Sequence, residues 1–526
     1  MNRLPQEIFS EIIGCFQEQE VDKPALATIS RQWHAAIERH VFRTLHVRST
    51  DADRFQEIVR HGRRRLVERI DYVVELPAYS EEERCQFERD DARQANDEAF
   101  TAAIHRLFRI LASWDTRGDG YVDLRLADVY STSDHTDLRR SSPSLRPGHL
   151  VYAREEALGN RIADLWNWRH RYSFLRLLRA SDLPAVPVIR SFVVCPLTRN
   201  ICSRAPVEMA ARMPSLRSGD WKLSDWQMPY TALRGAQRRD FAQALVDDAV
   251  KVRTQLLALE SLSFVMSPVG AWAPNFATGN LNAQDNSTST GDVLSDALRT
   301  YTASISTLKE LHITGAIDGS LFWFGPAQPL PEPYWPKLER LHVEFSTTRP
   351  CGGSYFRFRD PRKAVGGSPK VETPPGYGDS EEEDAKAALR FSEWKHVQYL
   401  NVSYDPVPDD DLLMPLMEAF GRACLQIPML KLAGLSTLIP TSKGAISKFG
   451  MAKWGVWYLG PGTPSYLSTE GISQRRLIWA VMGWRPSADL RNLLREIGSE
   501  TWDHEMVEKY VHSPETPGIP MDVGMV

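Results

Sequence analysis

The polar residues of this chain that have the spacing of a metal site lie in one acidic stretch near residue 115. Asp115 and Asp119 fall at the first and fifth positions of a calcium-binding loop. Such a loop also needs an oxygen ligand at its third position and a bidentate glutamate at its twelfth, where this chain has Arg117 and Leu126. We therefore predict a turn that leads into a strand over 122–129, and no metal site.

Other patterns that carry catalysis or hold a cofactor are missing from the sequence. It contains no Gly-x-x-x-x-Gly-Lys-Ser/Thr phosphate loop, and Gly455, Gly460 and Gly462 do not have the spacing of a dinucleotide fingerprint. His-Glu-x-x-His and Gly-x-Ser-x-Gly are absent as well. We predict no catalytic residues and no cofactor, so the chain is expected to bind rather than to catalyse. A hydrolase or transferase with an unrecognised site stays open as an alternative.

Composition limits the partners and the compartment. The chain has 526 residues, a formal net charge of -4 and a pI near 6.4, which gives no overall attraction to nucleic acid or to an anionic membrane. No apolar run approaches the length that spans a bilayer. The six cysteines lie far apart, without a Cys-x-x-Cys pair, which argues against disulfides and zinc. We expect a cytoplasmic or nuclear protein.

The densest apolar pattern lies in the first 45 residues of the sequence. One stripe of a short helix is predicted from apolar residues four apart: Leu4, Ile8, Ile12 and Phe16. Pro5 suits the first turn of that helix, and Asp22 with Pro24 marks a second helix start. The apolar face continues through Ile29, Trp33 and Ile37. Three short helices bury too little surface to stand alone, so the rest of the chain or a partner must cover them.

These residues carry a resemblance to a known module. Leu4-Pro5-x-Glu7-Ile8, the stretch from Leu26 to Trp33, and Val41-Phe42-x-x-Leu45 resemble the F-box of fungal F-box proteins, although Arg31-Gln32-Trp33 replaces a commoner run of that family. The match covers about the first tenth of the chain. In that family the module docks on the SKP-type adaptor of a cullin–RING ubiquitin ligase. The resemblance implies these adaptor-binding residues: Leu4, Pro5, Ile8, Ile12, Leu26, Ile29, Trp33 and Val41.

A strand motif recurs in the sequence after this module. Apolar residues at i, i+3 and i+5 occur at Val67/Ile70/Tyr72, Ile189/Phe192/Val194, Leu259/Leu262/Phe264, Leu308/Leu311/Ile313, Leu338/Leu341/Val343 and Val397/Leu400/Val402. Several copies follow a helical segment, which is typical of leucine-rich repeats. The later copies are 49, 30 and 59 residues apart, so we infer insertions between them. His312 and His342 follow the leucine of two copies and are predicted to point outward, toward a ligand or solvent. The alternative is a general α/β domain with a mostly parallel sheet.

The expected fold class is α/β, with an N-terminal three-helix F-box followed by an irregular leucine-rich-repeat-like solenoid and a C-terminal cap. Residues 1–46 are the F-box, 47–427 the substrate-binding repeat region, 428–512 a Trp-rich cap and 513–526 a flexible tail. Polar, Gly-rich and Pro-rich stretches predict disordered insertions at about 130–150, 268–292 and 351–385. The run from Ile478 to Pro486 also resembles the C-terminal segment of fungal F-box proteins with such repeats.

The sequence thus predicts a substrate-recognition subunit of an SCF-type (SKP adaptor–cullin–F-box) E3 ubiquitin ligase. Its partners would be the adaptor, through it a cullin–RING ligase, and an unknown protein substrate, with no nucleic acid and no membrane. The alternative is a repeat-based interaction scaffold without a ligase role, whose N-terminal helices only cap the repeats. In a scaffold the stripe of Leu4, Ile8 and Ile12 would be buried against the first repeat instead of partly exposed.

Overall fold

The structure is a computed structural model in which the chain divides into two compact units. Unit 1 comprises Met1–Ile201 and Glu208–Trp221, and unit 2 comprises Cys202–Val207 and Lys222–Val526. The structure describes residues 6–15, 23–84, 86–115, 120–134, 169–170, 172–225, 230–255, 258–267, 280–282, 291–323, 334–358, 374, 376–378, 380, 406–440, 451–465, 471–502 and 505–511.

Unit 1 begins with three short helices where the apolar pattern predicts them. They are α1 (Gln6–Cys15), α2 (Lys23–Ala27) and α3 (Arg31–Arg43). The Ser30 side chain caps α3, because its hydroxyl accepts a hydrogen bond from the backbone N–H of Trp33 at 3.3 Å. The last residue of α3 is followed directly by the first residue of strand β1, so no linker separates this helix from the sheet.

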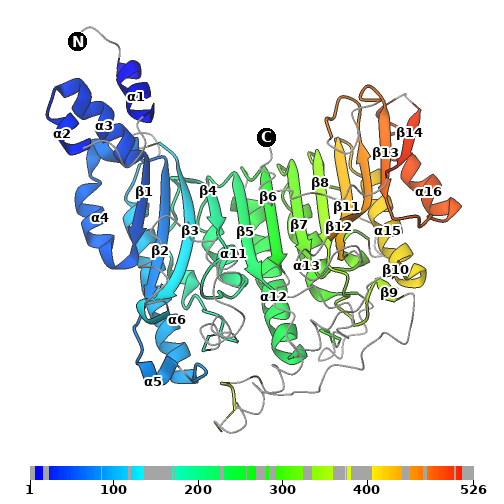
Figure 1. The fold of residues 1–526 in the computed structure, drawn as a ribbon, viewed down its shortest axis with the longest axis horizontal. Helices are drawn as coiled ribbons and strands as arrows, with labels where there is room; N and C mark the ends of the chain where they lie inside the picture. The colour runs from blue at the N-terminus through cyan, green and yellow to red at the C-terminus, as the bar shows by residue number, and fades with distance from the viewer. Residues whose placement is uncertain are drawn as a thin grey trace. The chain divides into compact units, whose positions relative to one another are not determined.

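The sheet of unit 1 is parallel and its strands follow chain order. They are β1 (Thr44–Arg48), β2 (Arg69–Leu76), β3 (Val122–Ser131), β4 (Ile189–Val194) and the residues of β5 (Ser218–Ser224) up to Trp221. The strand predicted over 122–129 is confirmed as part of β3. Figure 1 shows β1, β2 and β3 side by side, with α3 next to β1.

Helices connect these strands and cover the sheet of unit 1. They are η1 (Ser49–Asp51), α4 (Ala52–Ile58), η2 (His61–Leu66), α5 (Glu81–Arg84), α6 (Asp90–Ala112), η3 (Thr132–Asp134), η4 (Ala180–Asp182) and α11 (Arg204–Ala210), which the two units share. The longest, α6, packs on β2, and the Tyr72 hydroxyl donates a hydrogen bond to the Ala103 carbonyl at 2.9 Å. Phe100 and Ile104 are fully buried on this face of α6.

The sheet of unit 2 starts parallel and ends mixed. Its order is β6 (Ser261–Ser267), β7 (Glu310–Gly315), β8 (Arg340–Phe345), β11 (Leu432–Pro440), β12 (Met451–Leu459), β13 (Arg475–Ala480) and β14 (Met506–Tyr510). The pairs from β6 to β11 are parallel, β12 is antiparallel to both of its neighbours, and β13 and β14 are parallel. A separate antiparallel pair joins β9 (Phe356–Phe358) to β10 (Pro406–Pro408). The helices are α12 (Thr231–Gln255), α13 (Val293–Ala303), η5 (Gly319–Leu321), α15 (Asp410–Leu425) and α16 (Ala488–Arg495).

The predicted α/β class is confirmed, and most strand pairs are parallel in both units. The recurring motif is in register in unit 2, where Leu262 pairs with Leu311 and Leu311 with Leu341. All three side chains are buried, as a core shared between neighbouring strands requires. The predicted copy at 397–402 lies outside the described residues, and the strand that pairs with β8 is β11, which the sequence assigned to the C-terminal cap.

Parts of the predicted insertions are ordered. Asp134 is buried in η3, Asp292 caps α13 by accepting a hydrogen bond from the Ser295 N–H, and β9 lies within 351–385. Asp134 and Asp292 are buried in ordered segments because ion pairs and hydrogen bonds compensate for the burial of their charges. The amino-acid composition of these stretches does not reveal such partners. The rest of the three insertions falls mostly outside the described residues, as does the predicted tail 513–526. No helix in the described part of the chain has the length and apolar character needed to cross a membrane.

Candidate functional site

The three N-terminal helices enclose a small core of their own. Phe9 and Ile13 of α1 are buried against Ala36 and Ile37 of α3. The Trp33 ring meets the Phe9 ring edge-on, with 5.3 Å between their centroids. Such aromatic pairs add a modest stabilisation beyond the area that they bury. We refer to α1, α2 and α3 as the N-terminal module.

The described residues that the sequence assigns to adaptor binding all keep part of their surface in solvent. Ile8 is 37%, Ile29 60% and Val41 46% exposed. Ile12 and Leu26 are half-buried, and so is Trp33. Leu4 and Pro5, the first two predicted docking residues, lie outside the described residues. The structure therefore places three large aliphatic side chains of one small module in contact with solvent.

The sequence predicted the part of the module core that α3 contributes through Ile37, but not the part contributed by α1. The four-residue stripe singles out Ile8 and Ile12, whereas the structure buries their neighbours Phe9 and Ile13. The signal was the adjacent pairs Ile8-Phe9 and Ile12-Ile13, because two neighbouring apolar residues on a helix point about 100° apart and so widen the apolar face. One side of α1 packs on α3, and the other is left open.

The N-terminal module is held firmly to the first strands of unit 1. Arg43 at the end of α3 forms an ion pair with Glu68 at 2.8 Å, and the Glu68 N–H donates to the Arg43 carbonyl at 2.9 Å. Glu38 in the middle of α3 pairs with Arg63 of η2 at 2.7 Å. The Arg63 guanidinium also lies over the ring of Phe42, 4.9 Å from its centroid. These contacts, together with the direct passage into β1, position the exposed side chains on a fixed support.

A buried ion network follows the carboxyl ends of β2, β3 and β4 in unit 1. Arg199 donates two hydrogen bonds of 2.9 Å to the Asp134 carboxylate and a third of 2.9 Å to Glu88. Burial alone raises the pKa of Asp134, but the charges of Arg199 and His170 outweigh it and hold that pKa below its usual value. The Tyr79 hydroxyl donates to Asp134 at 2.7 Å. Because these groups are buried and pair with one another, we interpret the network as structural.

Unit 2 contains a second network of the same kind. Arg234 pairs with both oxygens of Asp225 at 2.6 and 2.8 Å, and Arg238 links Asp225 to Asp292. Burial raises the pKa of Asp225, and the Arg234 guanidinium lowers it below its usual value. Burial also raises the pKa of Asp318, which lies near Asp292. Neither network was predicted from the sequence. Arg199 lies 65 residues from Asp134, and Arg238 lies 54 residues from Asp292.

Other groups with potential chemistry do not assemble into a site. His312 and His342 are neighbours on β7 and β8, with ring centroids 5.0 Å apart, and both are half-buried. Burial and the nearby Lys453 lower the pKa of His342 well below its usual value. Within the described residues, no three His, Cys, Asp or Glu side chains are grouped so that they would hold a metal ion.

One carboxyl of unit 1 titrates near neutral pH. Burial raises the pKa of Asp97 in α6 to about 6, against the lowering effect of a hydrogen bond that it accepts from the Arg176 N–H at 2.8 Å. Only 8% of the residue is exposed, and it lies on the buried side of its helix. Its role is to anchor the segment that precedes β4.

No protein-family model matches the chain, and no curated protein matches it. Ile8, Ile29 and Val41 of the N-terminal module form the candidate binding surface.

Proposed function

We propose that this chain is the substrate-recognition subunit of an SCF-type E3 ubiquitin ligase. Its N-terminal module binds an SKP-type adaptor, and the strand–helix region behind it binds a protein substrate. One observation carries the proposal: the module closes a core of its own and still leaves Ile8, Ile29 and Val41 in solvent. The resemblance of this segment to an F-box supports the choice of partner.

The exposure of these side chains favours docking over capping. In a repeat scaffold, α1 would turn its Ile8 side toward the first strands, yet Ile8 remains 37% exposed. Burying a fully exposed side chain of this size is worth roughly 1.5–3 kcal/mol, and a partly exposed one such as Ile8 contributes a fraction of that. Three exposed aliphatic side chains on one small module supply apolar surface that a partner can bury.

Function in such a subunit comes from proximity. Contacts that hold a target lysine near an activated donor raise its effective concentration, and the chain itself supplies no reacting group. A firm support between the adaptor and the substrate is an advantage in that role. Within unit 1, the direct passage of α3 into β1 and the backbone hydrogen bond from the Glu68 N–H to the Arg43 carbonyl supply such a support.

The strand–helix region that follows the N-terminal module is suited to binding a protein substrate. Parallel strands that follow chain order are typical of leucine-rich repeats, which bind partners on the open face of the sheet. His312 and His342 are half-buried side chains on such strands in unit 2. We propose the leucine-rich-repeat-like solenoid as the form of this region.

The adaptor assignment is tested by binding of the purified chain to a purified SKP-type adaptor. We expect the double substitution Ile8→Asp and Ile29→Asp to abolish co-purification, because it places charges in the apolar centre of the interface. Val246→Asp is the matched control, since Val246 is 44% exposed on α12 of unit 2. Unchanged adaptor binding by the double variant, with the control also unchanged, would refute the assignment.

A further inference from the structure

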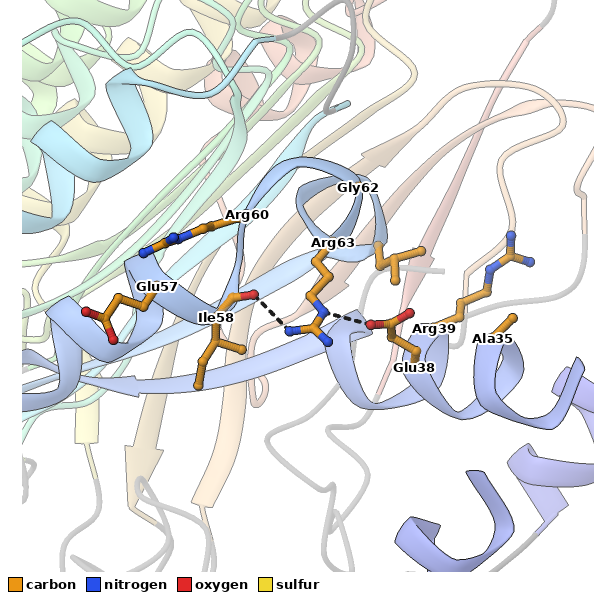
Figure 2. A pocket seen from close by; sticks show the side chains of 9 residues that line it. Ala35, Glu38, Arg39, Glu57, Ile58, Arg60, Gly62 and Arg63 are labelled. Carbon is orange, nitrogen blue, oxygen red and sulfur yellow. Dashed lines mark hydrogen bonds and ion pairs between the residues drawn. The ribbon is translucent and has the colours of Figure 1, made fainter. Parts of the chain in front are cut away.

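A groove of about 600 Å³ lies beside the N-terminal module, between α3 and the segment that links α4 to β2. Figure 2 shows its walls. The α3 wall carries Ala35, Glu38 and Arg39, and the opposite wall carries Ile58, Arg60 and Arg63. The ion pair between Glu38 and Arg63, at 2.7 Å, joins the two walls (Figure 2). All of these residues belong to unit 1.

The groove uses a different face of α3 from the core of the N-terminal module. Ala35, Glu38 and Arg39 are three and four residues apart, so they share one side of the helix. Ala36 and Ile37 face the module core on the other side. The groove and the core of the N-terminal module therefore lie on opposite sides of α3.

The segment around this groove is strongly basic. Residues 31–69 contain ten arginines and no lysine against five carboxylates, although the whole chain carries a net charge of -4. Three of these carboxylates are already paired within unit 1: Glu38 with Arg63, Asp53 with Arg106, and Glu68 with Arg43. The pairing leaves an excess of positive charge on the surface.

Seven of these arginines are exposed, and their side chains form no ion pair or hydrogen bond with the described residues. They are Arg31, Arg39, Arg48, Arg54, Arg60, Arg65 and Arg69. Two of them, Arg39 and Arg60, stand on opposite walls of the groove. The planar guanidinium group donates paired hydrogen bonds that match a carboxylate or a phosphate.

The rest of the lining favours a peptide over a nucleic acid. Ile58 is 38% exposed at the groove, and Leu66 beside it is half-buried, so an apolar side chain has a surface to contact. Glu57 also lines the groove and forms no ion pair with the described residues, so it would repel a phosphate beside it. A peptide can place its carboxylates beside the arginines and its neutral residues beside Glu57.

We propose that this groove binds an extended, carboxylate-rich segment of a partner protein. Arg39 and Arg60 hold carboxylates of the segment at the two walls, and Ile58 contacts one of its apolar side chains. This interaction goes beyond the proposed adaptor binding and does not depend on which protein covers Ile8 and Ile29.

The test uses the full chain and a short fluorescent peptide rich in Asp and Glu with leucines between them, read by fluorescence anisotropy. We expect the double substitution Arg39→Glu and Arg60→Glu to weaken peptide binding about tenfold or more, because both charge-assisted contacts become repulsive. The matched control is Arg48→Glu with Arg69→Glu, which makes the same change of charge on exposed residues outside the groove lining. We expect this control to weaken binding less than about threefold, through the screened field of the surface alone.

Two further probes distinguish the class of ligand. A peptide in which Asn and Gln replace Asp and Glu should bind at least about tenfold more weakly to the unaltered chain, because a neutral amide lacks the negative charge that strengthens hydrogen bonds from a guanidinium ion. A single-stranded oligonucleotide of equal charge should bind more weakly than the acidic peptide. The proposal is overturned if the unaltered chain does not bind the acidic peptide, if both double variants lose equal affinity, if the amide peptide binds as tightly, or if the oligonucleotide binds more tightly through Arg39 and Arg60.

Discussion

The N-terminal module and the sheet of unit 1 differ in how completely they bury their apolar residues. In β2, Ile70, Tyr72 and Val74 are at most 1% exposed, because α6 covers them and neighbouring strands flank them. In the N-terminal module, Ile8 and Ile29 remain 37% and 60% exposed. Both regions belong to unit 1, so the same compact unit contains a closed core and an open one. An exposed apolar surface of this kind is what the proposed adaptor binding requires.

The two regions also treat charge differently. At the carboxyl ends of β2, β3 and β4, Arg199 and its carboxylate partners are almost completely buried and make several hydrogen bonds. Around α3, the paired groups Arg63 and Glu38 are partly exposed, so their ion pair contributes less. Rigid burial therefore characterises the sheet, and an open, charged surface characterises the neighbourhood of the N-terminal module.

The largest expected effect tests whether the sheet of unit 1 depends on its buried charges. Arg199→Met would leave Asp134 and Glu88 buried without their cation, and we expect it to destabilise unit 1 by about 3–5 kcal/mol. Hydrogen exchange of peptides from β3 would report the loss as faster local opening. Exchange in the strands of unit 2 serves as the internal control. Unchanged protection of β3 would mean that the network contributes little and that the contrast with the surface pairs is wrong.

The contrast in apolar burial is tested by two matched truncations. Ile104→Ala removes a fully buried side chain of α6, and we expect it to cost about 2–5 kcal/mol of unfolding free energy. Ile8→Ala removes a partly exposed side chain of the same type, and we expect a change below about 0.5 kcal/mol. Denaturant unfolding of both variants beside the unaltered chain would measure the difference. Equal losses would show that α1 packs as tightly as α6 and leaves no surface for a partner.

A smaller effect sharpens the comparison through pH. The pKa of Asp97 is about 6 in the folded chain, above the value of about 3.9 expected for an unfolded chain. The stability linked to this carboxyl is therefore fully present below pH 3.9 and is lost as pH rises through about 6. Asp97→Asn keeps the acceptor for the Arg176 N–H and cannot ionise. We expect the variant to melt above the unaltered chain at pH 7, with a gap that closes as the pH falls below 4.

If the difference in melting temperature between the two proteins stayed constant across this pH range, folding would not change the pKa of Asp97. Glu57→Gln is a suitable control, because Glu57 is an exposed carboxyl near the N-terminal module. Its substitution should change the melting temperature little at any pH. The control separates titration of the buried carboxyl from the general change in net charge.

Much of the fold was predictable from local patterns. The motif at Leu308, Leu311 and Ile313 identifies β7, and a similar pattern identifies β8, because inward-facing residues of a strand recur at fixed short spacings. The antiparallel strand β12 was not predicted, although Trp454 and Trp457 on it are nearly fully buried. A tryptophan-rich run indicates burial without indicating the direction in which the strand pairs.

The candidate docking surface was predictable only in part. The helices of the N-terminal module and most of its apolar residues follow from spacing, yet the sequence did not distinguish the buried pair Phe9 and Ile13 from the exposed Ile8. All of these residues are apolar, and their exposure depends on where α3 packs. The sequence did not reveal that Arg39 and Arg60, 21 residues apart, line the same groove.

The sequence by itself determined the local elements of this protein: three short helices at the amino end and strands with a recurring apolar motif. These depend on residues two to five positions apart, which a single stretch of chain contains. Only the tertiary structure decided which side of α1 is closed and which carboxylates meet Arg199. Those outcomes depend on contacts such as the pair Arg199 and Glu88, 111 residues apart. Burial is a property of the packed chain, so it emerges only when distant segments meet.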